Sequence, residues 1–218
     1  MILAACPGGP TSNLITHLAK GDTGLSISLT TVNSLITIFT IPFVVDFALT
    51  QFLDSNELVQ INKLQTVIQI FAIVIIPVSI GMAIKNTKPA FADKMNKPVK
   101  IASAAVLFLV IIGLVLKKRE DLIPYLQQAG LTALALNVAT ILIGFITAKI
   151  AKLNWTQSIT ISIESGIQNG TMAIAIASGI LMNDNYAIAP AVYSLIMFFT
   201  GGAIIAFGMK TIKQKATH

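Results

Sequence analysis

Charged residues are scarce in this sequence. Only 11% of its 218 residues are charged, 55% are hydrophobic, and the mean hydropathy is +0.80, whereas a soluble domain carries about 25% charge. Aromatic residues are also few, at 7%, and long apolar runs without alternation favour helices over an outer-membrane barrel. These features predict an all-α integral membrane protein that is polytopic, crossing the bilayer several times.

Cysteine is nearly absent as well. The single residue Cys6 excludes an internal disulfide and a cysteine metal cluster, so we expect no transition-metal site. The sequence shows no nucleophile–base pair and no metal-ligand spacing, which argues against an enzyme. We attribute the net charge of +6 to lysines in membrane-flanking loops, and we expect no nucleic-acid partner.

Apolar runs predict six full membrane spans, preceded by an N-terminal half-helix that ends near Lys20. A run of about 20 apolar residues is long enough to cross the hydrocarbon layer. A polar, slightly acidic loop over residues 51–65 separates the first full span from the second. The six predicted spans cover approximately residues 22–47, 66–84, 99–116, 123–148, 157–182 and 186–209.

Lysines are distributed unevenly between the predicted loops. If the basic tail after residue 209 is cytoplasmic, eleven of the fifteen basic residues lie on that side and four on the other. This excess follows the positive-inside rule. We therefore expect a multi-pass protein in contact with membrane lipid, with its C-terminus in the cytoplasm. The high content of isoleucine and lysine favours a bacterial inner (plasma) membrane.

Proline and glycine interrupt the first apolar stretch. Two prolines and two glycines within the five residues Cys6–Pro10 are incompatible with a continuous helix. A new helix is expected to begin near Pro10, because proline is tolerated in the first helical turn. The residues expected to break the helix here are Pro7, Gly8 and Gly9.

A second interruption is predicted in the middle of the apolar run 157–182. Glu164 is followed by Gly166, Gln168 and Asn169. A charge and two amides would thus lie deep in hydrocarbon, at a place where glycine weakens the helix. Ionisable groups within a membrane segment usually mark an ion or substrate path. The alternative is a protonated Glu164 with a structural role only.

A weak internal repeat relates the two ends of the chain. Residues Thr31–Thr40 are similar to Ala191–Thr200, with an offset of 160 for the pair Ser34 and Ser194. Equivalent elements lie five spans apart, and an odd number inverts one copy relative to the other. Interrupted segments in corresponding positions of two inverted halves are typical of secondary transporters, whose site lies at the midplane where the broken helices cross.

The polar side chains near the interruptions suit a small, hard cation. Neutral oxygens and one carboxylate match sodium, since a divalent ion usually recruits more carboxylates. Other hydroxyls, on Ser28, Thr31 and Ser34, are expected to bond only to carbonyls of their own helix, and Asn137 is expected to bridge two helices. The candidate sodium ligands are Ser12, Asn13, Ser26, Thr30 and Glu164.

Both interruptions closely resemble those of the bile acid:sodium symporter family. Residues Cys6–Asp22 and Leu25–Thr30 are similar to its fourth and fifth helices, and Glu164–Asn169 is similar to its ninth. The resemblance implies part of a ten-helix inverted-repeat (5+5) transporter fold with discontinuous crossing helices. The whole chain, 1–218, would be a single transmembrane transporter domain, with 1–50 ending the first repeat and 66–210 forming the second.

The resemblance also assigns roles to particular residues. The family binds two sodium ions where its broken helices cross, and the second site takes a further side chain from the third helix. The first sodium site matches Ser12, Asn13, Ser26, Thr30 and Glu164, and the second, incomplete here, matches Glu164 and Gln168. The substrate cavity would include Pro10 and Asn169, and the helix breaks would fall at Pro7, Gly8, Gly9 and Gly166.

The function implied is sodium-coupled symport of an organic anion by alternating access, with Na+ as the coupling ion. The anion would be a bile acid or a smaller carboxylate, and the aromatic pair Phe198 and Phe199 favours the smaller one. The chain would begin inside the family's fourth helix, as an N-terminally truncated member lacking about three and a half helices. The alternatives are a proton-coupled carrier of the same fold and a non-transporting membrane fragment.

Overall fold

A computed structural model describes residues 1–52, 63–117 and 122–216, and the regular elements in these ranges are helices. The N-terminal part comprises α1 (Ile2–Ala5), α2 (Pro10–Leu18) and α3 (Thr23–Phe52). The remaining helices are α4 (Lys63–Thr87), α5 (Pro89–Lys117), α6 (Leu122–Ile150), α7 (Trp155–Gly166), α8 (Gly170–Ile174), a π-helical turn (Ala175–Ile180) and α9 (Asn185–Ala216).

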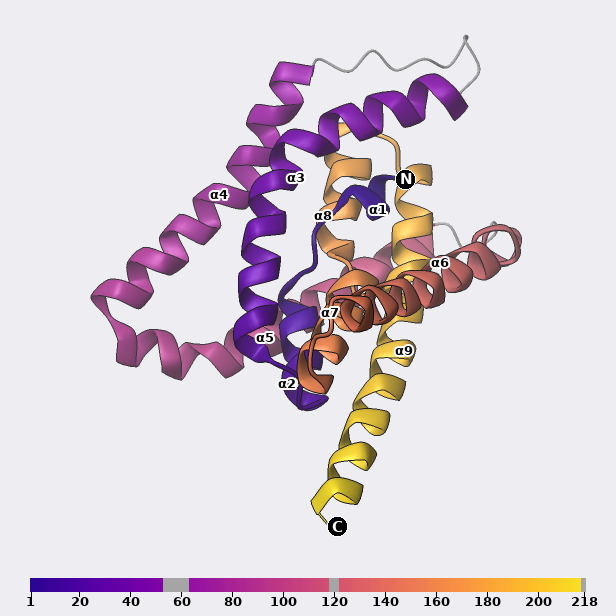
Figure 1. Ribbon diagram of the computed structural model, residues 1–218. Coiled ribbons are helices and arrows are strands. Elements are labelled where there is room, and N and C mark those ends of the chain that lie inside the picture. The colour runs from indigo at the N-terminus through magenta and orange to yellow at the C-terminus, as the bar shows by residue number, and fades with distance from the viewer. Residues whose placement is uncertain (53–62, 118–121, 217–218) are drawn as a thin grey trace.

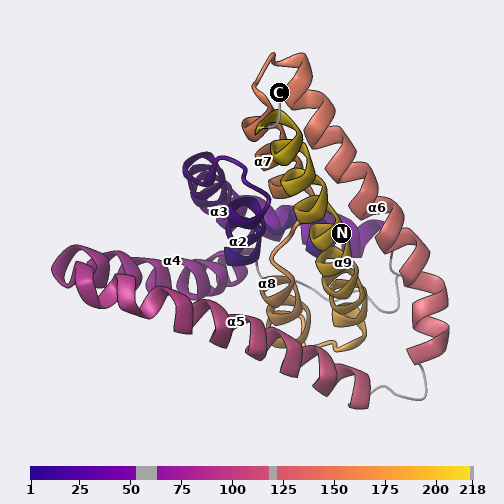
Figure 2. The same ribbon diagram turned by 90° about the horizontal axis from the view of Figure 1, so that it is seen from below.

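The helices are arranged around the two short ones, α2 and α7 (Figure 1). Helix α6 packs along α7 and α9, and α3 contacts α2 and α7. Helices α4 and α5 pack on each other and reach away from this group, with α4 also contacting α3 (Figure 2). The largest fully buried side chains include Tyr193, Ile38 and Ile163, which come from α9, α3 and α7.

Three of the described helical segments are long and apolar enough to cross a membrane: Thr23–Phe52, Ala129–Ile150 and Asn185–Gly208. Large apolar side chains cover the outside of α3, where Phe39 and Phe43 are each 60% exposed. Such an outward apolar face fits contact with lipid or with further membrane helices. The predicted spans 66–84 and 99–116 form helices as α4 and α5, and the count of six full spans stays a prediction.

Helix α5 begins about ten residues before the predicted span does, at Pro89. Proline at the first helical position favours this start. Phe91, Met95 and Val99 then follow at intervals of four, the spacing of one helix face. The residues between the predicted spans 66–84 and 99–116 were expected to form a lysine-bearing loop, and this prediction was wrong, since most of them are helical. The lysines lower the mean hydropathy of this stretch without breaking its helical period.

Both predicted interruptions are present and lie side by side. The first separates α1 from α2 and contains Pro7, Gly8 and Gly9, while the second begins after Gly166, the last residue of α7. Their backbones form an antiparallel bridge between Gly8 and Gln168. The Asn169 amide also donates a hydrogen bond to the Pro7 carbonyl oxygen at 2.9 Å. The freed backbone groups of each broken helix are thus partly satisfied by the other.

Two glycines allow the second broken helix to approach its neighbours closely. A Cβ atom on Gly166 would lie 2.2 Å from the Cγ1 atom of Ile141 on α6, and one on Gly170 would lie 1.9 Å from the Oγ atom of Ser194 on α9. Both distances are far below van der Waals contact. The ends of α7 and α8 therefore sit against α6 and α9 only because these two positions lack a side chain.

Replacing Gly170 with alanine should destabilise the protein by about 1–3 kcal/mol, the usual cost of overpacking. Ser194→Ala removes the nearest obstacle, because the next atom, the Cβ of Ser194, lies 3.1 Å from the added carbon. Ser194→Ala alone should cost little, since the Ser194 hydroxyl bonds only to the Pro190 carbonyl of its own helix. Thermal unfolding in detergent should show partial recovery in the double variant. Additive losses would contradict the proposed close contact.

Candidate cation-binding site

The Glu164 carboxylate is buried at the crossing and is surrounded by hydroxyl groups. The residue is 6% exposed and lies on α7, one turn before the second interruption. Its Oε1 atom accepts hydrogen bonds from Ser12 on α2 at 2.7 Å and from Ser26 on α3 at 2.5 Å. Its Oε2 atom accepts one from Thr30 on α3 at 2.9 Å. Three helices thus meet at a single carboxylate.

The Asn13 side chain adds another oxygen to this group. Its Oδ1 atom lies 2.7 Å from the Ser26 hydroxyl and 3.4 Å from the Thr30 hydroxyl. The Ser12 hydroxyl also lies 2.8 Å from the Gly9 carbonyl oxygen. All five residues predicted as ligands of the first sodium site are therefore brought together, and a backbone carbonyl joins them.

The cluster contains more short oxygen–oxygen contacts than it has hydroxyl protons to form hydrogen bonds. Six hydroxyl–acceptor contacts link the cluster, but each hydroxyl carries one proton. With the Asn13 amide oxygen facing the cluster and Glu164 ionised, only the three hydroxyl protons are available for the six contacts. The remaining contacts bring lone pairs together in a buried place, which is costly unless a positive charge lies among them. A set of neutral oxygens with one carboxylate is suited to a monovalent hard cation.

A protein cation does not supply this charge. In the part of the chain that the structure describes, no Lys, Arg or His side chain lies within ion-pair distance of the Glu164 carboxylate. A buried carboxylate normally requires a partner of opposite charge. A bound monovalent cation or a proton would be a partner of this kind for Glu164.

The local sequence explains how the ligands are positioned. Helix α2 begins at Pro10, so Ser12 and Asn13 lie in its first turn, next to the interruption. Ser26 and Thr30 are four residues apart on α3 and so share one face. This face is the one turned toward α7, as the hydrogen bonds of both residues to Glu164 show.

Gly8 leaves room for the carboxylate. A Cβ atom at this position would lie 2.5 Å from the Oε2 atom of Glu164 and 3.2 Å from the Ser12 hydroxyl oxygen. Gly8 was predicted to break the helix. The structure adds a second reason for glycine here, because any side chain at residue 8 would enter the oxygen cluster.

The second predicted ion site is present only in part. The Gln168 side chain donates a hydrogen bond through Nε2 to the Ser165 carbonyl oxygen at 3.0 Å. Its Oε1 atom is buried without a hydrogen-bond partner among the described residues. A buried, unpartnered amide oxygen fits a cation ligand. The pairing of Gln168 with Glu164 in one site stays a prediction.

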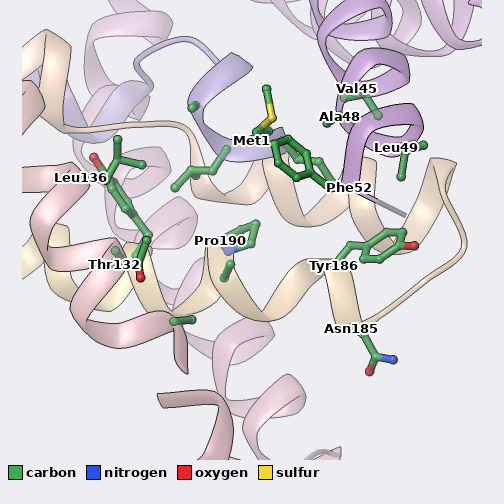
Figure 3. Close-up of a pocket in the computed structure, with 17 residues that line it drawn as sticks. Met1, Val45, Ala48, Leu49, Phe52, Thr132, Leu136, Asn185, Tyr186 and Pro190 are labelled. Carbon is green, nitrogen blue, oxygen red and sulfur yellow. The ribbon is translucent and has the colours of Figure 1, made fainter. Parts of the chain in front are cut away.

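Asn169 and Pro10 were predicted to line a substrate cavity. The Asn169 Oδ1 atom accepts a hydrogen bond from the Met172 backbone amide at 3.0 Å and so caps α8. A cavity of about 670 Å³ lies between α1, α3, α6 and α9, and Figure 3 shows its lining, which is largely apolar. Neither Pro10 nor Asn169 lines it. Their role at a substrate cavity stays a prediction.

The Gly166 carbonyl, at the end of α7, is held by two buried donors. Asn137 on α6 donates through Nδ2 at 2.8 Å, and the Tyr193 hydroxyl on α9 donates at 2.8 Å. The prediction that Asn137 bridges helices is confirmed. Tyr193 was not predicted as a partner, although its place inside the repeated segment Ala191–Thr200 was a usable signal. Together the two residues fix where α7 ends, and hence where Glu164 lies.

Other hydroxyls on α3 bond within their own helix, as predicted. Ser28, Thr31 and Ser34 donate to the carbonyl four residues earlier, at 2.9, 2.7 and 2.7 Å respectively. Their hydroxyls therefore bond to different partners from those of Ser26 and Thr30, although all five residues lie within three turns of α3. Only the pair that faces α7 reaches Glu164.

Broken helices that cross, with a buried carboxylate among hydroxyls, define a membrane protein of the secondary-transporter class. Residues 1–124 match the family described as Sodium Bile acid symporter family. The chain belongs to that family, which consists of membrane transporters and not of enzymes.

Several curated proteins are similar to the chain. An uncharacterized sodium-dependent transporter, YocS, of Bacillus subtilis (strain 168) is 26% identical over 219 residues, covering 99% of this chain and 65% of the relative. The ileal sodium/bile acid cotransporter of Homo sapiens is 26% identical over 213 residues, covering 95% and 60%. A probable chloroplastic sodium/metabolite cotransporter of Oryza sativa subsp. japonica is 26% identical over 207 residues, covering 95% and 48%. The chain thus spans about half to two thirds of the length of these relatives.

Removing one donor from the Gly166 carbonyl should loosen the end of α7. We expect Asn137→Ala to lower the unfolding free energy by about 1–3 kcal/mol, the cost of losing a buried hydrogen bond. Thr147→Ala on the same helix is the matched control, because the exposed Thr147 hydroxyl bonds only to its own helix. Thermal unfolding in detergent measures both. Equal melting temperatures for the two variants would argue against a clamp at Gly166.

Proposed function

We propose that the protein is a sodium-coupled secondary transporter of an organic anion that works by alternating access. The observation that carries this proposal is the oxygen cluster around Glu164, in which three protons serve six contacts at the crossing of two broken helices. The relatives support it, since the Bacillus subtilis protein is named a sodium-dependent transporter. The other two are named a sodium/metabolite and a sodium/bile acid cotransporter.

Sodium would be held by ligands from three helices. Bound among these oxygens, the ion would replace repulsion between lone pairs by attraction and draw α2, α3 and α7 together. When the ion leaves, the uncompensated oxygens would favour a looser arrangement. This difference between the occupied and empty states is what allows an ion to shift a conformational equilibrium. The proposed ligands are Ser12, Asn13, Ser26, Thr30 and Glu164, with Gln168 contributing to a second, less complete site.

The substrate would bind beside the ion, at the crossing itself. The segments around Gly9 and Asn169 are in contact there, because a Cβ on Gly9 would lie 3.4 Å from the Asn169 side chain. The N-terminal end of α2 lies at the same place, and the positive end of its helix dipole favours an anionic group. An organic anion such as a bile acid or a smaller carboxylate fits these features. Because ion and substrate would share the crossing, each would favour binding of the other.

A proton-coupled carrier is the second candidate. The shortage of protons in the cluster would also be relieved by one added proton, placed on Glu164. Proton uptake and release at this carboxylate would then replace the sodium cycle. The two candidates use the same residue and the same crossing, so only the ion that drives uptake separates them.

The membrane placement follows from the arrangement of the helix ends. In Figure 1 the turn from α4 to α5, the turn from α6 to α7 and the C-terminal end of α9 lie on the lower side, whereas α3 ends and α4 begins at the top. The lower side carries the lysine-rich turns, so we place it in the cytoplasm by the positive-inside rule. The proposed location is a bacterial plasma membrane, as expected for a relative of a Bacillus subtilis transporter.

Sodium binding should depend on the α3 hydroxyls that face Glu164. We expect Ser26→Ala and Thr30→Val to weaken equilibrium binding of radioactive sodium to the purified protein roughly five- to a hundredfold, the equivalent of about 1–3 kcal/mol. Glu164→Gln should abolish it. Ser28→Ala and Thr31→Ala are matched controls on the same helix, since both hydroxyls bond only to their own helix. Loss of binding in the controls as well would sink the ligand assignment.

Uptake by reconstituted vesicles separates the two coupling ions. Accumulation of a labelled bile acid and of a small carboxylate should rise with an inward sodium gradient at constant pH. It should not rise with a pH gradient in sodium-free buffer. The reverse pattern would favour the proton-coupled carrier. No uptake in either gradient, with sodium binding intact, would mean that the ion site is present without transport of these anions.

A further inference from the structure

The turn between α4 and α5 carries an unusual concentration of positive charge. Five of the fifteen basic residues of the chain lie between residues 85 and 100, against a single acidic residue, Asp93. The oxygen cluster and the crossing make no use of this segment. The five lysines are Lys85, Lys88, Lys94, Lys97 and Lys100.

This segment is folded and compact at the turn. Helix α4 ends at Thr87 and α5 begins at Pro89, so only Lys88 separates them. The Lys88 backbone amide donates to the Ile84 carbonyl at 2.8 Å, and the Ala92 amide donates to the Lys88 carbonyl at 3.0 Å. An ion pair between the side chains of Lys85 and Asp93 links the two helices. Among the described side chains, those of Lys85, Lys88 and Lys94 are exposed on this turn.

The first three turns of α5 are amphipathic. Phe91, Met95 and Val99 follow at intervals of four, so they share one face. Phe91 is 52% exposed and Val99 is 56% exposed, and Lys94 is exposed as well. An exposed apolar stripe beside lysines, directly before a predicted membrane span, is the pattern of a helix that lies in the headgroup layer of a membrane.

We propose that residues 85–100 form a docking surface for the headgroups of anionic phospholipids. The lysines would attract the negatively charged phosphates, and the stripe of Phe91, Met95 and Val99 would lie at the boundary with the acyl chains. Clusters of four to eight basic residues next to a membrane helix favour anionic lipids. The lysine excess supplies the matching charge, and the apolar stripe explains why the phosphate belongs to a lipid.

A lipid-quenching experiment tests this surface. Trp155 is the only tryptophan, so Trp155→Phe together with Phe91→Trp places a single fluorophore on the apolar stripe. The full chain is reconstituted in phosphatidylcholine vesicles that contain the same mole fraction of either brominated phosphatidylglycerol or brominated phosphatidylcholine. We expect the brominated phosphatidylglycerol to quench more strongly. The excess should fall at high salt, because exposed charges are screened.

Two variants provide the controls. In the triple variant Lys94→Gln, Lys97→Gln and Lys100→Gln, the two brominated lipids should quench equally, while sodium binding is retained. A tryptophan at Phe52, at the far end of α3, should show no preference. Equal quenching in the parent, or an excess that survives in the triple variant, would overturn the proposal.

A second measurement avoids the tryptophan substitutions. The unaltered chain and the triple variant are extracted from vesicles of equal phosphatidylglycerol and phosphatidylcholine content, and the lipids that remain bound after purification are measured by mass spectrometry. The unaltered chain should retain phosphatidylglycerol in excess over the triple variant. Equal ratios in the two samples would refute an anionic-lipid surface. Both outcomes are independent of the proposed transport function.

Discussion

The bonds of three hydroxyls to the Glu164 carboxylate are the interaction on which the rest of the site depends. A carboxylate inside a membrane protein is expensive unless its charge is compensated. Here compensation comes from α2 and α3, whose hydroxyls reach the carboxylate at 2.5–2.9 Å. These three hydroxyls have fewer protons than acceptor contacts. In the proposed function a bound cation would supply the missing positive charge and would also hold the three helices together.

The crossing of the two broken helices makes this cluster possible. Two unbroken helices would contact each other through side chains, which keep their backbones apart. Here the bridge between Gly8 and Gln168 brings the backbones themselves into contact. Glycine is required wherever this contact is closest, at Gly8 against the carboxylate and at Gly170 against α9. The same positions that weaken the helices thus create the space for the site.

The end of α7 is also fixed from the outside. Asn137 and Tyr193 hold the Gly166 carbonyl from two different helices, so this oxygen has its hydrogen bonds satisfied beside the crossing. If the oxygen cluster on the other side binds an ion as proposed, ion binding would alter the position of α2 and α3 relative to this fixed end of α7.

The sequence by itself determined the helical class, the places where the helices break, and which hydroxyls bond within their own helix. These features depend on composition and on spacings of three or four residues, so Ser28, Thr31 and Ser34 could be assigned from their surroundings. The polar residues near the two breaks also suggested the five residues of the oxygen cluster, and the family resemblance assigned them to a sodium site. Only the tertiary structure decided that Ser12 meets a carboxylate 152 positions away, that Gly8 makes room for it, and that Tyr193 supports Gly166. Such contacts depend on how two distant breaks pack together, and no local spacing encodes that geometry.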